Sequence, residues 1–251
     1  MQILLANAKI MFNQTDMTPT TTPLFQSVAE LLAMEMASMY IDELGRQLDC
    51  SRKLAAENKQ RYHNFFTARK MPAILAYNGQ AYKHLKASTL SPETLQFGQQ
   101  HLWITCFLYG LLRPLDGIVP YRMEHCVKLE TTNGKPINQY WKDKLTDALI
   151  ESVKKDDGTL IHLSTEEYEH LFDWKRVKEE IQVVQPLFYV RTVKGLKMQA
   201  VWAKSCRGAM VRFILENRLT KPEELQSFTY EGFGYNPHIG EQAFPHFVRE
   251  S

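Results

Sequence analysis

The sequence has few cysteines and no cysteine pattern. Its four cysteines, at positions 50, 106, 126 and 206, stand alone, with no Cys-x-x-Cys pair and no zinc-finger spacing. This excludes a disulfide-stabilised secreted scaffold and a recognisable structural zinc site. Isolated thiols are typical of the reducing cytoplasm.

Long apolar runs are also missing. No segment reaches the roughly 18 consecutive apolar residues of a membrane-spanning helix. The first twelve residues contain a short apolar run without the basic leader that begins a signal peptide. We therefore expect a cytoplasmic protein that has no membrane partner.

An excess of charge of one sign is lacking as well. The chain has 30 basic and 28 acidic residues and a net charge of +2, so any preference for nucleic acid must come from local clustering. There is no internal repeat, Gly-rich phosphate loop, dinucleotide fingerprint, nucleophile elbow or His-Glu-x-x-His helix. The sequence therefore predicts no cofactor and no resident metal, and it favours a binding protein over an enzyme.

The 251 residues have the ordinary composition of a globular protein, with 44% hydrophobic residues. Strand patterns alternate with helix patterns, which predicts one mixed α/β domain over residues 1–251, with a mixed sheet surrounded by helices. The tail beyond Lys221 is expected to be mostly loop. The expected strands are 2–6, 72–77, 159–163, 181–191 and 195–202, and the main expected helices are 25–44, 49–66, 91–112 and 137–153.

The segment from Lys194 to Lys221 has the strongest positive charge. It contains seven basic residues and one acidic residue, Glu216. Alternating apolar residues predict a strand that ends at Trp202. Ser205 would then cap a helix, because its hydroxyl can accept from a free backbone N–H of the first turn.

Lys204 and Arg207 would lie at the start of this helix, with Arg212 further along it. Cations at this end oppose the helix dipole, but a bound anion would suit both the cations and the free N–H groups. Gly208 would permit a close approach to the backbone. Alternatively, these cations are solvated or pair with carboxylates elsewhere in the fold.

The same cations allow a second hypothesis, in which the chain is an enzyme. Residues near strand ends and helix starts would converge on a phosphorylated small molecule. This group would consist of Lys9, Tyr168, Lys204 and Arg207, with Glu166 or Glu167 as a base.

Metal and thiol chemistry have weaker signals. Glu124, His125 and Cys126 form the only compact set of potential ligands, but side chains of consecutive residues diverge, so we predict no metal site there. Direct iron binding by these residues and other histidines is a third hypothesis for the chain. Cys206 lies beside two cations and is expected to have the lowest thiol pKa of the four cysteines. We nevertheless favour the interpretation of Cys206 as an unreactive, packed side chain over a reactive thiol that senses oxidant.

The segment from Leu102 to Arg122 contains a second candidate phosphate site. We expect the helix that begins at Ser91 to continue to about Leu112, with Gly110 near its end. In a helix-hairpin-helix module, a Gly-bearing turn offers backbone N–H groups to a phosphate. Alternatively, Gly110 lets helices pack closely, while Arg113 caps the carbonyl groups at the helix end.

Several longer blocks are more specific than these patterns. Through them the sequence resembles, nearly from end to end, the YaaA-like peroxide stress protein family of bacteria. The blocks are AILAYNGQAYKHL (73–85), QQHLWITCFLYGLLRPLDGIVPYRME (99–124), HLSTEEYEHL (162–171), VWAKSCRGAMVRFILENRLTKPEEL (201–225) and EGFGY (231–235).

The resemblance implies a cytoplasmic protein that limits iron-driven Fenton damage during peroxide stress. It also implies an α/β fold of the family's own and sequence-independent binding of duplex or distorted DNA. That binding would use a positive cleft and a helix-hairpin-helix-like element at residues 101–113. The residues predicted to bind DNA or another anion are Lys9, Gly110, Arg113, Arg122, Lys204, Arg207, Gly208 and Arg212.

The chain departs from the family pattern at three places. The family's Lys-Lys-Ala-Arg-Gly is Lys204-Ser205-Cys206-Arg207-Gly208 here, which keeps the first Lys, the Arg and the Gly but loses one charge. The family's Ser-Pro-Ala-Lys after the first strand is Ala-Asn-Ala-Lys here, so Ala6 and Asn7 replace the hydroxyl and the proline. The family's Ser-Gly before Leu-Tyr-Gly is Cys106-Phe107.

Overall fold

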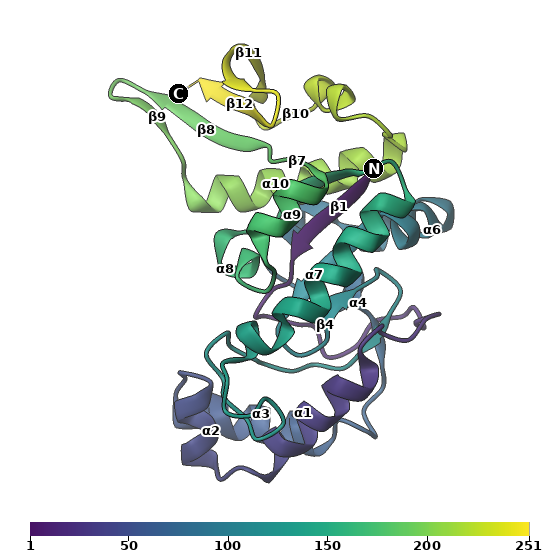
Figure 1. Cartoon of the computed structure of the whole chain (residues 1–251), viewed down its shortest axis with the longest axis vertical. Coiled ribbons are helices and arrows are strands. Elements are labelled where there is room, and N and C mark those ends of the chain that lie inside the picture. Colours follow the sequence, from purple (N-terminus) through teal and green to yellow (C-terminus); the bar gives the residue numbers. More distant parts are fainter. Residues whose placement is uncertain (251) are drawn as a thin grey trace.

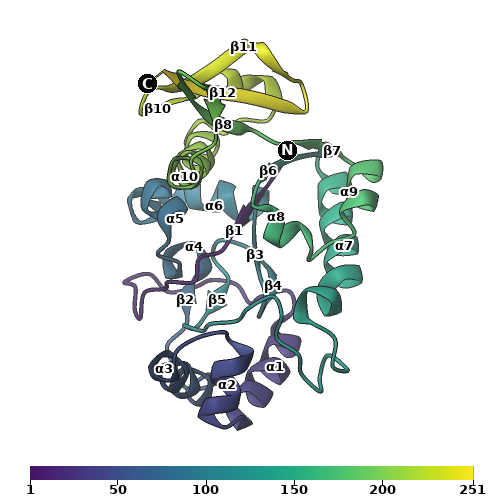
Figure 2. The same cartoon turned by 90° about the vertical axis from the view of Figure 1, so that its left-hand side faces the viewer.

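A five-stranded sheet forms the centre of the molecule (Figure 2). The computed structural model describes residues 1–250. The strand order is β4-β3-β1-β6-β7, and all strands are parallel to their neighbours except β4, which is antiparallel to β3. The strands are β1 (Gln2–Ala6), β3 (Leu102–Cys106), β4 (Gly110–Leu112), β6 (Thr159–Leu163) and β7 (Gln182–Val184).

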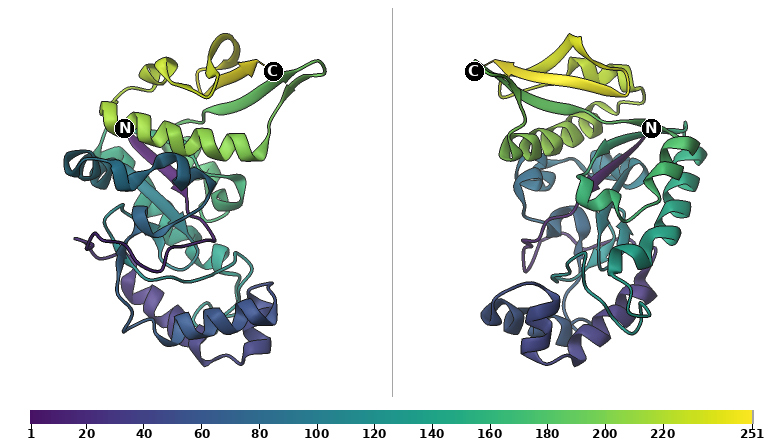
Figure 3. Two further views of the ribbon diagram at one scale, coloured as in Figure 1. Left: turned by 180° about the vertical axis from the view of Figure 1, so that it is seen from behind. Right: turned by 60° about the vertical axis from the view of Figure 1, so that its left-hand side comes forward.

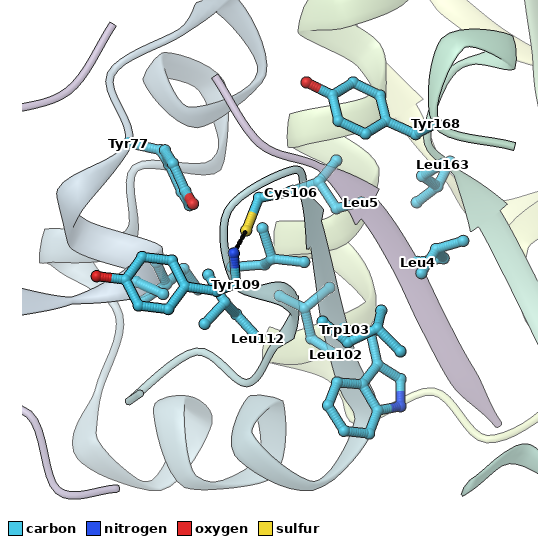
Figure 4. Close-up of a cluster of buried hydrophobic side chains, with 14 of the residues drawn as sticks. Leu4, Leu5, Tyr77, Leu102, Trp103, Cys106, Tyr109, Leu112, Leu163 and Tyr168 are labelled. Carbon is cyan, nitrogen blue, oxygen red and sulfur yellow. Dashed lines mark hydrogen bonds between the residues drawn. The ribbon is translucent and has the colours of Figure 1, made fainter. Parts of the chain in front are cut away.

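The strands β1, β3 and β6 form because most of their residues are apolar on both faces. Ile3, Leu4 and Leu5 are almost fully buried, and all five residues of β3 and of β6 are buried. A parallel sheet with both faces covered requires such continuous apolar strands. Figure 4 shows Leu4 and Leu5 beside side chains of β3 and β6, and the Tyr109 N–H that donates to Cys106 Sγ in the turn after β3.

Helices cover both faces of this sheet, with α5 and α6 on one side and α7 and α9 on the other (Figure 2). Ser91 caps α6 by accepting from the Thr94 N–H, as its position before Pro92 predicts. The helices around this sheet are α4 (Ala73–Ala76), α5 (Gln80–Leu85), α6 (Pro92–His101), α7 (Ile137–Lys155), α8 (Glu166–Glu169) and α9 (Trp174–Glu180), with a 3₁₀ turn η1 (Ala87–Thr89).

Three helices form a separate group at one end of the molecule (Figure 1). They are α1 (Gln26–Ser38), α2 (Ile41–Gln47) and α3 (Arg52–His63), so the single helix expected over 25–44 is interrupted between α1 and α2. Ser51 caps α3 as expected. Nearby, the two-residue strands β2 (Met71–Pro72) and β5 (Gly117–Ile118) pair with each other.

The C-terminal part of the chain forms a second sheet, which lies above the long helix α10 (Ala200–Asn217) (Figures 1 and 3). The tail was expected to be loop, but most of it is paired in strands, and aromatic rings such as Phe228 and Phe247 fill the space beneath the sheet. The order is β10-β11-β12-β8-β9. The strands are β8 (Leu187–Thr192), β9 (Gly195–Lys197), β10 (Thr229–Tyr230), β11 (Phe233–Glu241) and β12 (Phe244–Glu250), with a 3₁₀ turn η2 (Pro222–Ser227).

The strand expected over 195–202 ends at Lys197, and its last three residues belong to α10. Two further expected elements are wrong because short apolar runs suit both helix and strand. The segment 72–77 was expected to be a strand, yet Ala73–Ala76 forms the helical turn α4. The segment 102–112 was expected to complete a helix, yet α6 ends at His101. Trp103, Ile104 and Thr105 favour a strand, and their complete burial does not fit a helix with one apolar stripe.

The helix-hairpin-helix element expected at residues 101–113 is therefore replaced by the hairpin of β3 and β4. Gly110 begins β4 with φ +72°, a conformation that favours glycine. A Cβ atom at Gly110 would lie 2.8 Å from Leu145 Cδ2. Gly110 therefore faces the α7 side of the core.

The helix α10 begins earlier than expected, at Ala200, with Gln199 in the N-cap position. Ser205 is consequently inside the helix, where its hydroxyl donates to the Val201 carbonyl at 2.9 Å. Lys204 and Arg207 lie in the second and third turns. The start of the helix therefore lies at least one turn before Lys204 and Arg207, and the expectation that the two cations flank the helix start is wrong.

No helix within residues 1–250 combines the length and the apolar character that crossing a membrane requires.

Candidate functional site

A cavity of about 530 Å³ opens at the carboxyl ends of β1 and β6. Its walls are the segment after β1 (7–10), the segment after β6 (165–168), the start of α5 (79–82), and Lys204 and Arg207 of α10. In the sheet, β3 lies on one side of β1 and β6 on the other. Open α/β sheets bind ligands in the crevice at such a reversal of strand order.

The position of α10 against this cavity depends on Gly208. A Cβ atom there would lie 1.8 Å from the Ala81 carbonyl oxygen, so only glycine lets α10 and α5 come this close. The close approach expected at Gly208 is thus made by α5 rather than by a bound anion. It places Lys204 and Arg207 beside the start of α5.

Lys204 and Arg207 are three positions apart, on neighbouring turns of one helix face. Arg207 is only partly exposed, and burial lowers its pKa, although the guanidinium stays protonated at neutral pH. Neither residue makes a side-chain hydrogen bond or an ion pair within residues 1–250, and both line the cavity. A half-buried cation without a partner is an expected feature of an anion site.

The cations Lys9 and Arg122 share one carboxylate. Lys9 Nζ lies 2.7 Å from Glu124 Oε2, and Arg122 Nη2 lies 2.7 Å from Glu124 Oε1. The Glu124 side chain is 7% exposed, whereas that of Lys9 is 50% exposed. Lys9 lines the cavity, but Arg122 does not. Both cations are therefore partly neutralised before any ligand binds.

Tyr168 lies in the cavity wall and is held by two neighbours. Its hydroxyl donates to Asn7 Oδ1, and its ring stacks on Phe107 with centroids 4.8 Å apart. Asn7 Nδ2 donates to the Tyr121 hydroxyl at 3.2 Å, which lies 2.8 Å from the Tyr77 hydroxyl. Burial raises the pKa of Tyr168, so the phenol is neutral. Asn7 and Phe107, two of the residues that depart from the family pattern, thus position Tyr168.

A buried histidine supports the segment after β6. The Ser164 N–H donates to His162 Nδ1 at 3.2 Å, and His162 Nε2 lies 2.8 Å from Glu169 Oε1. Nδ1 accepts, so the proton of the neutral ring is on Nε2 and is donated to Glu169. Burial lowers the pKa of His162, and the hydrogen bond from His162 lowers the pKa of Glu169. A charged carboxylate is thereby kept near Arg207.

Glu124, His125 and Glu167 are the one described group whose donor atoms come close enough to hold a metal, all within 4.8 Å of one another. Cys126 is exposed and does not belong to this group. Glu124 already pairs with two cations, so a divalent ion would meet their positive charge. That no metal is held here stays a prediction.

Arg113 lies at the opposite, amino-terminal edge of the sheet. Its guanidinium donates to Gln2 Oε1 at 3.0 Å and to Ser152 Oγ at 3.1 Å, and it lies 3.4 Å from the centre of the Trp103 ring. Burial lowers the pKa of Arg113 to about 10. Its donors are used inside the fold, away from the cavity.

Arg212 is also separate from the cavity. It donates to Thr89 Oγ1 at 2.7 Å and to Glu216 Oε1 at 2.6 Å. The structure thus brings Lys9, Lys204 and Arg207 together but leaves Gly110, Arg113 and Arg212 elsewhere. The six residues of the small-molecule hypothesis all line one cavity: Lys9, Glu166, Glu167, Tyr168, Lys204 and Arg207.

The favoured interpretation of Cys206 as a packed cysteine is confirmed, and its neighbouring cations do not give it a low thiol pKa. The thiol is buried, and this burial raises its pKa to about 12. Arg207 and Arg249 lower the pKa of Cys206 less than burial raises it, because α10 turns the Cys206 side chain into the core. Cys206 is therefore a packed, unreactive cysteine.

Gln80 is a cavity residue that the sequence analysis missed. Its amide nitrogen lies 2.9 Å from Ser205 Oγ and 3.1 Å from His84 Nε2. A glutamine in the first turn of a short helix has no sequence signal of its own. The only pointer was its place in the specific block 73–85.

Comparisons with known proteins agree with the family resemblance. The family model described as peroxide stress protein YaaA matches residues 1–239. A UPF0246 protein of Phocaeicola vulgatus is 43% identical over 240 residues, covering 94% of each chain. A UPF0246 protein of Bacteroides thetaiotaomicron is 40% identical over 246 residues, covering 96% of each chain. One of Porphyromonas gingivalis is 40% identical over 234 residues, covering 92% of this chain and 91% of its own. The chain therefore belongs to the peroxide stress protein YaaA family.

Proposed function

We propose that this peroxide stress protein acts by binding the phosphate or another anionic group of a small molecule in the cavity beside β1. The observation that carries the proposal is Arg207, a half-buried guanidinium that has no partner within residues 1–250 and lines the cavity with Lys204. Two cations on one helix face suit a doubly charged phosphate monoester.

The cavity favours a small ligand over a long polyanion. Its volume of about 530 Å³ falls in the usual range for small-molecule sites. Glu166 and Glu167 line the same cavity and would repel a chain of phosphates. Tyr168 is neutral and can only exchange hydrogen bonds, so the geometry supports binding without specifying a reaction.

Isothermal titration calorimetry with inorganic phosphate and propyl phosphate tests this proposal. The wild-type chain is compared with Lys204→Ala/Arg207→Ala and with a control, Lys194→Ala/Lys197→Ala. The control removes two cations from the same region, outside the cavity. We expect the first double variant to lose at least about tenfold in affinity and the control to bind as wild type. Equal affinities in all three proteins would reject the site.

DNA binding is a second candidate function for the same basic segment. Lys194, Lys197 and Lys204 make no ion pair within residues 1–250, so they are free to meet backbone phosphates, as the family resemblance implies. Fluorescence anisotropy with labelled duplex and branched DNA across a salt series tests this. Binding that weakens linearly in log salt, with a shallower slope in Lys194→Ala/Lys197→Ala, supports it. Absence of binding at low salt rejects it.

The cellular role follows from the family. We propose that ligand binding in the cytoplasm limits iron-driven damage during peroxide stress, as the resemblance implies. Cells that lack the chain would be complemented with wild type or with Lys204→Ala/Arg207→Ala and then exposed to hydrogen peroxide. Electron paramagnetic resonance of free intracellular iron is the readout. Equal iron levels with both proteins would show that ligand binding in the cavity is not needed for this role.

A further inference from the structure

The orientation of the Gln80 amide follows from its neighbours. The Ser205 hydroxyl proton is already donated to the Val201 carbonyl, so Ser205 Oγ can only accept a second hydrogen bond. The group that faces it at 2.9 Å must therefore be the NH₂ of Gln80. The amide oxygen of Gln80, Oε1, therefore does not face Ser205.

The second N–H of Gln80 is used as well. It faces His84 Nε2 at 3.1 Å, while His84 Nδ1 faces the Tyr230 hydroxyl. Burial lowers the pKa of His84, which agrees with a neutral ring that accepts on Nε2. Both donors of Gln80 are thus satisfied, and its Oε1 has no hydrogen-bond partner within residues 1–250. Gln80 lines the cavity, so this oxygen is an acceptor available to a ligand.

Two carboxylates add to this acceptor. Glu166 makes no hydrogen bond or ion pair within residues 1–250, and the one ion-pair contact of Glu167 is to His125 at 3.8 Å. Ionised carboxylates only accept hydrogen bonds. The cavity therefore combines two cations on α10 with three groups, on α5 and α8, that need donors. A ligand that carries only an anionic group would give no donor to the Gln80 amide oxygen and would leave the exposed carboxylates of Glu166 and Glu167 to water.

Hydroxyl groups match these acceptors. In dinucleotide-binding folds, a carboxylate at the carboxyl end of a strand accepts from sugar hydroxyls, and Glu166 follows β6 in a comparable position. A neutral amide oxygen beside the carboxylates also suits a hydroxyl. We propose that the ligand is a phosphorylated polyol, such as a sugar phosphate, with its phosphate at Lys204 and Arg207 and its hydroxyls at Gln80 Oε1 and Glu166.

This inference rests on the proposed phosphate site and adds the class of ligand. Gln80 and Glu166 become specificity-determining residues, because they distinguish a hydroxyl-bearing phosphate ester from one without hydroxyls. A site built to hydrogen-bond hydroxyls discriminates against analogues that lack them.

The test is calorimetry of the full chain with three probes of similar charge at the phosphate: ribose 5-phosphate, propyl phosphate and 3-aminopropyl phosphate. We expect wild type to bind ribose 5-phosphate at least about tenfold more tightly than the other two. Gln80→Met removes the acceptor, and Glu166→Gln removes the charge at an exposed position that does not endanger folding. Each should reduce the ratio of the ribose 5-phosphate affinity to the propyl phosphate affinity severalfold. Gln80→Met should not weaken propyl phosphate binding, and Glu166→Gln should strengthen it, because that variant loses a carboxylate that repels phosphate. Glu223→Gln, an exposed residue outside the cavity, is the control.

Each failure has its own meaning. If wild type binds propyl phosphate and ribose 5-phosphate equally, the phosphate site stands and the polyol inference is overturned. If 3-aminopropyl phosphate binds most tightly, the acceptors select an ammonium group, and the polyol inference is overturned as well. If none of the three probes binds, the proposed phosphate site itself fails. An unchanged preference in Glu166→Gln and in Gln80→Met also overturns the assignment.

Discussion

Gly208 and Ala81 are in contact through their backbones, so that a Cβ atom on Gly208 would lie 1.8 Å from the Ala81 carbonyl oxygen. This contact fixes α10 against α5, and both helices supply walls of the cavity. The residue that positions Lys204 and Arg207 is therefore one that carries no charge and no side chain.

Gly208→Ala should destabilise the chain, because the methyl group meets backbone rather than a movable side chain. We expect the free energy of unfolding to fall by about 1–3 kcal/mol, the usual range for overpacking. Urea unfolding followed by circular dichroism measures this. Gly234→Ala is the matched control, because no atom lies within 4 Å of its added Cβ and its φ is not positive. A Gly208→Ala variant as stable as this control would contradict the contact.

The four thiols should differ sharply in reactivity. Cys126 is exposed, whereas Cys106 and Cys206 are buried, and burial raises the pKa of both buried thiols, that of Cys206 to about 12. Because the thiolate is the nucleophile, iodoacetamide at neutral pH should modify Cys126 first and leave Cys106 and Cys206 intact. Peptide mass spectrometry of the folded chain gives the order. Rapid modification of Cys206 would show that α10 opens in solution.

The sequence predicted best where local chemistry decides the structure. Ser51 and Ser91 cap their helices as expected, because a hydroxyl before a helix start needs no distant partner. The segment Leu102–Cys106 was mistaken for a helix because its burial comes from neighbours far along the chain, in β1 and α7. Periodicity cannot distinguish a fully buried strand from a buried helix.

The sequence predicted several residues that line the cavity, but not the helix packing that positions them. Lys9 and Tyr168 do meet Lys204 and Arg207, because the carboxyl ends of the parallel strands β1 and β6 lie side by side. The expected helix start at Ser205 was wrong, since the helix is held by packing against α5 rather than by a serine cap. The role of Gln80 depends on contacts with α10 that no local pattern shows.

Glu124→Gln should change phosphate affinity and folding stability in opposite directions. Removing the shared carboxylate charge frees Lys9 in the cavity, so we expect affinity for inorganic phosphate to rise severalfold. Arg122, which is 19% exposed, would lose its ion pair, and the free energy of unfolding should fall by about 3 kcal/mol. Calorimetry and urea unfolding give the two readouts.

Glu130→Gln serves as the control for Glu124→Gln, because Glu130 is exposed and has no ion pair within residues 1–250. It should leave phosphate affinity and unfolding as in wild type. If Glu124→Gln were as stable as this control, the pairing of one buried carboxylate with two cations would be energetically unimportant. If its phosphate affinity fell, Lys9 would not act as a cation of the cavity.

His162 should make the fold sensitive to acid. Burial holds the pKa of His162 below its usual value near 6.5, so below that pH the unfolded chain binds a proton that the folded chain refuses. The free energy of unfolding should therefore fall as the pH drops from about 6.5 towards 5. The lowered pKa of Glu169 acts in a different window, because its contribution is lost only at more acidic pH, as the pH falls through the folded pKa of that carboxyl.

His162→Gln tests this assignment, because an amide can still donate to Glu169 and accept from the Ser164 N–H but does not titrate. We expect a shallower loss of stability between pH 6.5 and 5 in this variant, measured by urea unfolding at several pH values. His63→Gln, an exposed histidine of α3, should keep the wild-type slope. Parallel profiles for all three proteins would show that His162 accepts its proton in the folded chain, and Glu169 would then hold an imidazolium beside Arg207.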